Sequence, residues 1–572
     1  MKLLILLTVP ACLRLACLAV ADSDGAYESS FDSGLDQETL QGLCPDYTRY
    51  AVRKHKPFSK GPLRLPSQRP HQNCRKFTST AVEKVIDDLI PHIKDPDLAK
   101  IFENAFPNTL DTTIQWHVDG VESKAPQSPL LRDRDRWQGA QSFVVTGDID
   151  AEWLRDSTNQ LSQYQRLAAT SPAISKLILG AINTQSEYII QAPYCNAFQP
   201  PSPSRFPPAH NGQEDWVHPA YEPSVVFECK YELDSLANFL SLSNQYHAAT
   251  GDTSYLSPRW FKALSTITTV IEEQSFSTFN PNTRAYRGSE YLFTRSTRAG
   301  TETLNLGGVG NPLANGTNLV RSAFRPSDDA CTFGFLIPAN AMLSVELSRT
   351  ATILLAYSKT SEDISRTQSI AIASLSGRLA DRARLIREGI LEHAVVQHPH
   401  FGPVLAYEID GYGSHLLMDD ANVPSLLSLP LLGFLAHDDP LYINTRRLIL
   451  SPHNPYYLSG PKFSGIGGPH IGLMNAWPMS VLVQALTTDD EDEIIECLEK
   501  VKNVSVFGLI NESVDVERGV DPHGEGDGMT RSWFAWANSV FAQVVLMLAE
   551  KRPGLILDTE VAYVVGKGWQ EN

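Results

Sequence analysis

The sequence predicts an all-α protein built around one large helical domain. Apolar residues recur every three or four positions in several segments, whereas the apolar and polar alternation that marks a strand is sparse. Motifs that join acids or amides to aromatic residues recur from about Gly147 to Asn538, as if they all lined one site. With 572 residues, 42% of them hydrophobic, the chain has enough material for a large core. One extended domain therefore accounts for the spread of these motifs.

The N-terminus has the pattern of a cleaved signal peptide. Lys2 precedes an apolar run, and Ala19 and Ala21 stand in an A-x-A arrangement before Asp22. We expect a signal peptide at residues 1–21 and a mature protein that is secreted or stays in the lumen of the secretory pathway. An uncleaved anchor is the alternative, although the apolar run is short for a membrane span. No other segment is apolar enough to cross a bilayer.

After the signal peptide we expect an irregular N-terminal arm at residues 22–78 and the helical domain at residues 79–572. The arm is polar and rich in Pro, Lys and Arg. Helical spacing then begins in "TAVEKVIDDLIPHI", where one face carries Val82, Val85, Ile86, Leu89 and Ile90. Two further helices are expected in "ASLSGRLADRARLIREGILEHA" and "FAWANSVFAQVVLMLAEK". The long glycine-rich loop "SPHNPYYLSGPKFSGIGGPH" is expected to form a binding rim.

Cysteine usage fits an oxidising compartment. Cys12 and Cys17 lie in the expected signal peptide, and the six cysteines that follow include no C-x-x-C pair, so zinc is not expected. We expect one or two disulfides and prefer Cys44 with Cys74, because both lie in the irregular arm, where a cross-link is most useful. The sequons at Asn315, Asn503 and Asn511 are candidate glycosylation sites.

Charge and motifs narrow the class of ligand. The net charge of -17 argues against nucleic acid and anionic membranes as partners. The chain has neither a phosphate-binding G-x-x-x-x-G-K motif nor a dinucleotide fingerprint, so no cofactor is expected. The acid pairs in "GDID", "DDA" and "DDAN" lack the spacing of a known calcium loop, and we expect no metal, with a metal site kept as an alternative. We expect a monomer.

The recurrent motifs themselves predict a carbohydrate pocket. They include "GDIDAEWLRDS", "VHPAYE", "KYELDSL", "SAFRPSDDA", "DDANVPSLL", "GIGGPH", "WPM", "NES" and "TRSWFAWANS". Aromatic side chains stack on the apolar faces of sugar rings, while Asp, Asn, Arg and His hydrogen-bond the ring hydroxyls.

In this order the same motifs resemble those of glycoside hydrolase family 125, the exo-acting α-1,6-mannosidases. The resemblance covers about residues 80 to 550. It implies an (α/α)6 barrel with long active-site loops and hydrolysis of terminal α-1,6-linked mannose from a mannose-containing glycan. It also implies inversion at the anomeric carbon and no requirement for a metal.

The resemblance assigns two catalytic carboxyls, Asp234 as general acid and Glu512 as general base. An inverting glycosidase needs one protonated carboxyl at the leaving oxygen and one ionised carboxyl that activates water on the opposite face. The pKa of Asp234 must therefore be raised by burial or by neighbouring negative charge. Glu232 is the nearest rival to Asp234. Because it stands two positions away on an expected helix, we expect it to face elsewhere as a solvated or structural acid.

The resemblance also assigns residues to the sugar pocket. Arg155 and Asp156 are expected to clamp adjacent hydroxyls of the terminal mannose. Trp153 is assigned either to a sugar contact or to the core. Further pocket or neighbouring positions are Asp420, Asn422 and His470 as pocket residues, Asp148, Asp150, Asp328 and Asp419 as loop braces or helix caps, Arg325 in either role, and Trp536 in the core.

The chain departs from the family pattern beside the expected base and in the glycine-rich loop. Asn511, Val514, Gly468 and Ile471 stand where members commonly have other residues. Asn511 also creates a sequon next to Glu512, and because a glycan there would block the pocket, we predict that it is unmodified. A usually apolar position is occupied by Glu152, which is expected to alter the pocket entrance.

Alternative functions remain open at this point. A related helical-barrel glycosidase of other specificity, such as a glucoamylase-like enzyme, is one alternative. A secreted glycan-binding protein that has lost catalysis is another, although the presence of both carboxyls argues against it. A polysaccharide lyase is a weaker alternative.

Overall fold

A computed structural model describes residues 44–121, 136–362, 364–521 and 527–570 of the chain. The expected signal peptide lies outside these residues. From Pro45 onward the described residues belong to one structural unit. Among the described residues, no helix combines the length and the apolar character that crossing a membrane requires.

The described residues are mostly helical, as expected. The helices are α2 (Tyr47–Tyr50), α3 (Thr80–Leu89), α4 (Pro96–Ala105), α5 (Asn108–Thr112), α6 (Leu154–Ser162), α7 (Pro172–Gln191), α8 (Leu233–Thr250), α9 (Pro258–Glu273), α10 (Asn305–Gly308), α11 (Ile337–Thr360), α12 (Arg366–His393), α13 (Leu429–Leu432), α14 (Pro440–Ile449), α15 (Pro478–Leu486), α16 (Glu491–Val504), α17 (Ala535–Lys551) and α18 (Pro553–Ile556).

The strands are short and pair mainly as local antiparallel hairpins. They are β1 (Ile114–Val121), β2 (Gly139–Val144), β3 (Glu152–Trp153), β4 (Ala197–Phe198), β5 (Asp215–His218), β6 (Val226–Glu228), β7 (Leu292–Arg295), β8 (Phe335–Leu336), β9 (Val395–His398), β10 (Gly402–Leu405), β11 (Glu408–Ile409), β12 (His415–Leu416), β13 (Tyr457–Ser459), β14 (Ser464–Ile466), β15 (Asn475–Ala476), β16 (Val514–Asp515), β17 (Ala562–Val564) and β18 (Gly568–Gln570). The sheet β3-β4-β6 joins segments that are far apart in sequence.

The three helices predicted from apolar spacing are present. In α3, Val82, Val85, Ile86 and Leu89 are all buried, so the predicted apolar face does face the core. Helix α12 begins at a capping box in which Ser365 and Gln368 satisfy each other's backbone N–H groups. Helix α17 ends at Lys551, two residues before Pro553, as the sequence predicts.

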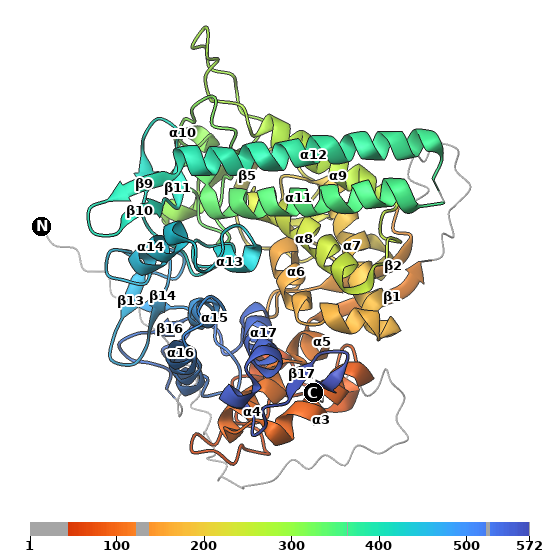
Figure 1. Ribbon diagram of the computed structural model, residues 1–572, viewed down its shortest axis with the longest axis vertical. Helices are drawn as coiled ribbons and strands as arrows, with labels where there is room; N and C mark the ends of the chain where they lie inside the picture. The colour runs from red at the N-terminus through yellow and green to blue at the C-terminus, as the bar shows by residue number, and fades with distance from the viewer. Residues whose placement is uncertain (1–43, 122–135, 363, 522–526, 571–572) are drawn as a thin grey trace, which may run out of the picture. The chain divides into compact units, whose positions relative to one another are not determined.

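The long helices pack in pairs. Helices α11 and α12 lie side by side along most of their length (Figure 1). Further pairs are α7 with α9 and α15 with α16. Helix α6 packs between α8 and α17, while α8 also contacts α11 and α17 also contacts α15. Consecutive neighbours therefore form a row from α11 through α8, α6 and α17 to α15.

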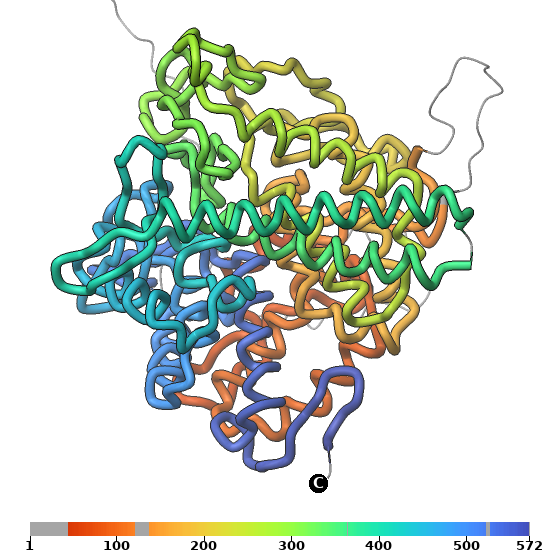
Figure 2. Tube along the Cα trace, turned by 45° about the horizontal axis from the view of Figure 1, so that its top comes forward, coloured from red at the N-terminus to blue at the C-terminus, as the bar shows by residue number. Residues whose placement is uncertain are grey.

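The two ends of the described chain meet. Helix α4 packs against α17, and both figures draw the orange N-terminal helices beside the blue C-terminal segment (Figures 1 and 2). Ile93 forms an isolated antiparallel bridge with Leu557. His92 Nδ1 lies 2.9 Å from Asp558 Oδ1. The helical domain thus closes on contacts between its first and last elements.

Residues 45–78 are irregular and are bonded to the helices that follow them. The backbone N–H of Gln68 donates to Asn104 Oδ1 at 2.8 Å, on α4. Arg69 Nε donates to Asp111 Oδ2 at 2.8 Å, on α5. Both acceptors are buried, so this segment covers the first helices.

The structure contains a disulfide that the sequence analysis did not anticipate. Cys195 and Cys229 are bonded across a separation of 34 residues. Cys44 and Cys74 are both disulfide-bonded as well, and their pairing with each other stays a prediction. Cys331 and Cys497 are free.

Candidate active site

Two helix N-termini bring the first set of polar residues together. Arg155 and Asp156 lie in the first turn of α6, and Asp234 lies in the first turn of α8, which packs against α6. All three are buried, with Asp234 fully inaccessible to solvent. The exposed N–H groups of a helix N-terminus favour negative charge, so both carboxylates stand where the backbone supports them.

Arg155 is the centre of this cluster. Its Nη1 donates to Glu232 Oε2 at 2.5 Å and lies 3.5 Å from Asp234 Oδ2. Its Nη2 lies 3.6 Å from Asp328 Oδ1, and its Nε lies 3.5 Å from Asp156 Oδ2. One guanidinium is therefore surrounded by four carboxyl groups.

The position of Glu232 corrects the expectation that it faces away as a solvated or structural acid. Helix α8 begins at Leu233, so Glu232 is the residue before the helix and is not bound by helical spacing. It is buried, and it holds Arg155 at a shorter distance than Asp234 does. Ser235 Oγ donates to its Oε2 at 3.0 Å.

Asn196 connects the segments of this cluster. Its Nδ2 donates to Glu232 Oε1 at 3.0 Å and to Asp328 Oδ1 at 3.3 Å. Its Oδ1 accepts from the backbone N–H of Lys230 at 3.0 Å, and its backbone carbonyl accepts from Leu154 N at 3.2 Å, where α6 begins. Asn196 follows Cys195 directly, so the disulfide fixes it beside the Glu232 segment.

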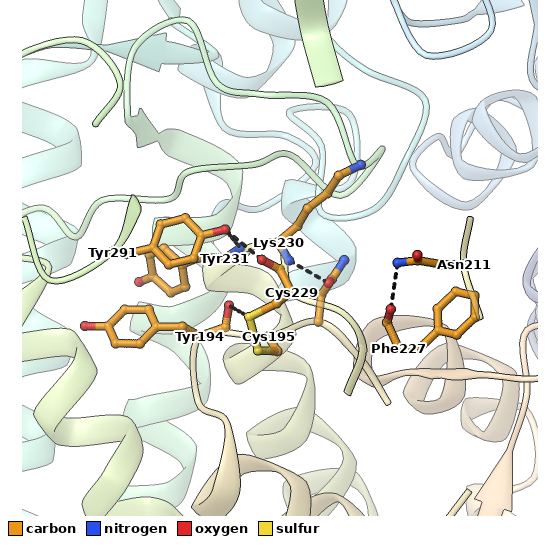
Figure 3. The surroundings of a disulfide bond; sticks show 9 residues. Tyr194, Cys195, Asn211, Phe227, Cys229, Lys230, Tyr231 and Tyr291 are labelled. Atoms are coloured by element: carbon orange, nitrogen blue, oxygen red, sulfur yellow. Dashed lines mark hydrogen bonds between the residues drawn. A yellow bond between two sulfur atoms is a disulfide. The ribbon is translucent and has the colours of Figure 1, made fainter. Parts of the chain in front are cut away.

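Aromatic residues surround the disulfide (Figure 3). Tyr291 Oη donates to the carbonyl of Cys229 at 2.9 Å and accepts from the backbone N–H of Tyr231 at 3.0 Å. The side chain of Lys230 points away from the sulfur atoms, and its Nζ lies 3.7 Å from Glu228 Oε1. The chain that leads into Glu232 and Asp234 is therefore held on both sides.

Burial sets the protonation of the cluster. It raises the pKa of Asp234 to about 6 and that of Asp156 to about 7, against the opposing charge of Arg155. Burial also raises the pKa of Glu232 well above its usual range. Burial opposes ionisation of Asp328 too, but the charges of Arg155 and Lys230 hold its pKa far below the usual range. Asp234 therefore has the high pKa that a proton donor needs.

Asp328 adopts a left-handed backbone conformation, with φ of +68°. Among residues with a side chain, Asp and Asn enter this region most readily, at a cost that the surrounding contacts must offset. The turn directs its carboxylate towards Arg155 and Asn196.

Glu512 lies in a second polar group. Thr530 Oγ1 donates to Glu512 Oε2 at 2.6 Å, and Arg531 Nη1 donates to Glu512 Oε1. Arg531 Nε also donates to Asp148 Oδ2 at 3.0 Å. The charge of Arg531 acts on Asp156 as well, so this group adjoins the Arg155 cluster.

Asp420, Asn422 and His470 belong to a third group. Asp420 Oδ1 accepts from both the backbone N–H and Nδ2 of Asn422, each at 3.2 Å, and Ser327 Oγ donates to Oδ2 at 2.7 Å. His470 Nδ1 lies 4.0 Å from Asp329 Oδ2. Since Asp329 follows Asp328, the segment 327–329 joins this group to the Arg155 cluster.

Residues 95–546 match the model of the metal-independent alpha-mannosidases of glycoside hydrolase family 125. The chain belongs to this family. The meiotically up-regulated gene 157 protein of Schizosaccharomyces pombe is 52% identical over 515 residues, which cover 90% of this chain and 94% of that protein. A Streptococcus pneumoniae metal-independent alpha mannosidase, solved in a non-productive complex with alpha-1,6-mannobiose, matches with a TM-score of 0.68 and 31% identity. The match covers 82% of this chain and 99% of that one.

This family 125 chain buries the tryptophans around its site. Trp153 is 7% exposed and packs in a small apolar cluster with Ala151 and Ala197, which is the core position considered from sequence. Trp536 is buried in the main core, as expected, and its ring lies 5.6 Å from Arg155 Cζ. The contact adds a cation–π interaction to the surroundings of that guanidinium.

Several buried polar atoms at the site have no hydrogen-bond partner among the described residues. They include Asp234 Oδ1, Trp153 Nε1, Trp536 Nε1, Tyr407 Oη and Asn511 Oδ1. Buried polar atoms are nearly always paired, so such a concentration is the pattern of a site whose partners arrive with a ligand.

Two expectations about acids near the opening motif are wrong. Glu152 does not lie at an entrance, because β3 pairs with β4 and turns its side chain into the interior, where it accepts from Val144 N at 3.2 Å. Asp148 and Asp150 do not cap α6, which has no side-chain cap. They act as loop braces instead, with Asp150 accepting from Gln115 at 3.3 Å.

Other candidates have structural roles. Asp419 accepts from the backbone N–H groups of Leu426 and Leu427 at 2.8 and 2.9 Å and braces its loop. Arg325 Nε donates to Glu408 Oε1 at 2.6 Å, inside the protein. Within the described ranges, no three or more His, Cys, Asp or Glu side chains converge so that they could hold a metal ion.

Sequence reasoning missed Asn196 and underrated Glu232 and Arg531. Arg531 stands in the quoted motif "TRSWFAWANS", so its motif was a usable signal. The role of Asn196 had no local signal, because it depends on the disulfide and on the fold of distant segments.

A cavity of about 680 Å³ lies elsewhere in this family 125 structure. It begins one helical turn beyond Arg155 and Asp234, at Asn159 and Asn238, and continues towards the C-terminal ends of the same two helices. Its walls include Asn244, Gln245, Glu346, Arg349 and Gln543, together with aliphatic residues.

Proposed function

We propose that the protein is an inverting exo-α-1,6-mannosidase that removes terminal α-1,6-linked mannose from glycans. One observation carries the proposal: in an α-mannosidase family member, Asp234 is fully buried, its pKa is raised to about 6, and its Oδ1 has no partner among the described residues. A proton donor needs these properties. We also infer that the helices form an (α/α)6 barrel, in line with the helix pairs and the likeness to the S. pneumoniae enzyme.

In this mechanism Asp234 gives its proton to the glycosidic oxygen while the bond from that oxygen to the anomeric carbon breaks. A water molecule forms the new bond to the anomeric carbon from the opposite face and gives its proton to Glu512. Glu512 begins the step as a carboxylate. The hydrogen bonds from Thr530 and Arg531 orient it and favour its ionised form. The product is mannose with inverted anomeric configuration.

The sugar-binding roles follow the three polar groups. Arg155 and Asp156 bind hydroxyls of the terminal mannose beside Asp234, and Asp420, Asn422 and His470 bind hydroxyls from the neighbouring loops. The alpha-1,6-mannobiose bound to the S. pneumoniae relative supports this class of ligand.

The test is NMR of the product anomer released from α-1,6-mannobiose. The wild type is expected to release β-mannose first, and Asp234→Asn and Glu512→Gln to lose activity by about 100-fold or more. Initial α-mannose would refute inversion. Binding without release by the wild type would favour a glycan-binding protein, and cleavage of other linkages in preference would favour a related glycosidase.

We also propose that the protein is secreted or lumenal and carries glycans on Asn315 and Asn503, which are exposed. Asn511 is buried, and its Nδ2 donates to the carbonyl of Arg531 at 3.0 Å. This supports the prediction that Asn511 is unmodified. Mass spectrometry of peptides from the protein made in a eukaryotic secretory host would test all three positions.

A further inference from the structure

The Arg155 cluster holds more acid than its one cation can balance. Asp156, Glu232, Asp234 and Asp328 surround a single guanidinium, so full ionisation would leave three uncompensated negative charges at a buried place. Uncompensated buried charge is costly, and carboxyls in this situation retain protons. Some carboxyls must therefore serve as the counter-ion while others stay neutral.

The geometry distinguishes these roles. Glu232 takes Arg155 Nη1 at 2.5 Å, whereas Asp234 lies 3.5 Å from the same nitrogen. Asp328 approaches the other terminal nitrogen, Nη2, at 3.6 Å. The Asn196 amide donates to both Glu232 and Asp328, and these two carboxyls also hydrogen-bond to each other. A carboxyl pair that shares a hydrogen bond holds one proton and carries one negative charge.

We propose that Glu232 and Asp328, bridged by Asn196, together form the counter-ion of Arg155, so that Asp234 keeps its proton for the leaving group. The inference rests on the proposed function, because it concerns how the general acid stays protonated. Glu232, Asp328 and Asn196 are positioning residues that act through Arg155. Without the pair, Arg155 would take Asp234 as its counter-ion and the donor would lose its proton before the reaction.

The other groups near Asp234 do not replace the pair. Around the cluster the charged or titratable residues are Arg155 and Asp156 on α6, Lys230, Tyr231 and Glu232 before α8, Asp328 and Cys331 on the following loop, His470 on the glycine-rich loop, and Arg531 near the C-terminus. Lys230 and His470 act on Asp328, and Arg531 acts on Asp156. Only the pair couples directly to Arg155 on both terminal nitrogens.

The test compares isosteric amide variants by pH profile. Glu232→Gln and Asp328→Asn each leave one carboxylate beside Arg155, so the basic limb of the kcat/KM profile should move little. The double variant leaves none, and the basic limb should move down by about one pH unit or more, since a cation at this distance lowers a carboxyl pKa by that amount. An unmoved limb in the double variant, or a full shift in either single variant, would overturn the proposal.

Leaving-group dependence gives a second readout that a merely structural defect would not reproduce. At pH 7 the double variant should lose about 100-fold or more on α-1,6-mannobiose, whose leaving oxygen needs a proton. It should lose less than about tenfold on 2,4-dinitrophenyl α-mannoside, whose leaving group departs unprotonated. Equal losses on both substrates would overturn the proposal.

Asn196→Ala keeps every carboxyl and serves if the double variant does not fold. It removes the amide that supports charge on the pair, so its basic limb should move down, by less than in the double variant. An unmoved limb would contradict the proposal. Asp234→Asn separates this inference from the proposed function: if it cleaves mannobiose like the wild type, the acid assignment has failed, whereas a strong loss there with unmoved limbs in the other variants rejects only the counter-ion pair.

Discussion

The two ends of helices α6 and α8 differ in chemistry although the same helices form them. At the N-terminal end, Arg155 is 2% exposed and four carboxyls surround it. At the other end, amides and aliphatic side chains line a cavity of about 680 Å³, and Arg349 pairs with Glu346 while remaining 46% exposed at its side chain. The larger space is thus at the end that lacks the converging acids. Volume alone does not locate the chemistry here; buried charge and unpaired polar atoms do.

Neutralising the arginine at each end should give the largest contrast. Arg155→Met removes the only close cation from a buried cluster, and we expect the protein to lose about 3–5 kcal/mol of unfolding free energy. Arg349→Met removes a half-exposed partner, and we expect about 1 kcal/mol or less. Urea unfolding of both variants at pH 7 measures the difference. Similar losses would show that the four carboxyls do not depend on Arg155.

The acid-rich end should also dominate the dependence of stability on pH. Burial raises the pKa of Glu152 to about 8 from its model value of 4.5, so the folded state binds this proton more tightly than the unfolded chain does. The stability from this proton is complete below about pH 4.5 and falls by about 1.4 kcal/mol per pH unit until the pH passes 8.

Glu152→Gln, which mimics the protonated side chain, is the matching test. We expect its melting temperature to equal that of the wild type at pH 5 and to exceed it at pH 8. Thermal unfolding followed by circular dichroism across this range measures the effect. Glu346→Gln at the cavity end is the control, and a larger effect there would reverse the comparison.

The smallest effect is expected inside the cavity. Gln245→Leu replaces an amide that donates to Ser241 Oγ at 2.9 Å, far along α8 from Asp234. We expect kcat/KM on α-1,6-mannobiose to change by less than about twofold, because the substitution leaves the Arg155 cluster intact. A tenfold loss would show that the two ends are coupled.

How far the sequence predicted this structure depends on the range of the interactions concerned. Helices α3, α12 and α17 were predictable because apolar spacing and terminal signals are local. Glu232 was misjudged because its role depends on α8 beginning one residue later, a boundary that periodicity does not fix. Glu152 was misplaced because only the pairing of β3 with β4 decides which way it faces.

The grouping of the site followed the same division. Motifs placed Arg155, Asp156 and Asp234 among the candidates, and the structure brings these three together. The contribution of Asn196 could not be predicted, since it depends on a disulfide between Cys195 and Cys229 and on a loop more than a hundred residues away. Partners that meet only through tertiary structure leave no periodic signal in the sequence.

The contact between the chain's two ends has a consequence for biosynthesis. His92 and Asp558 are 466 residues apart in sequence. As the chain emerges from the ribosome, α4 waits for its partner α17 until nearly all of the protein has been made. The surface that α4 buries against α17 therefore stays uncovered throughout translation, and contacts of such long range slow folding. A stop codon a few dozen residues early would leave the first helices without the partner that completes them.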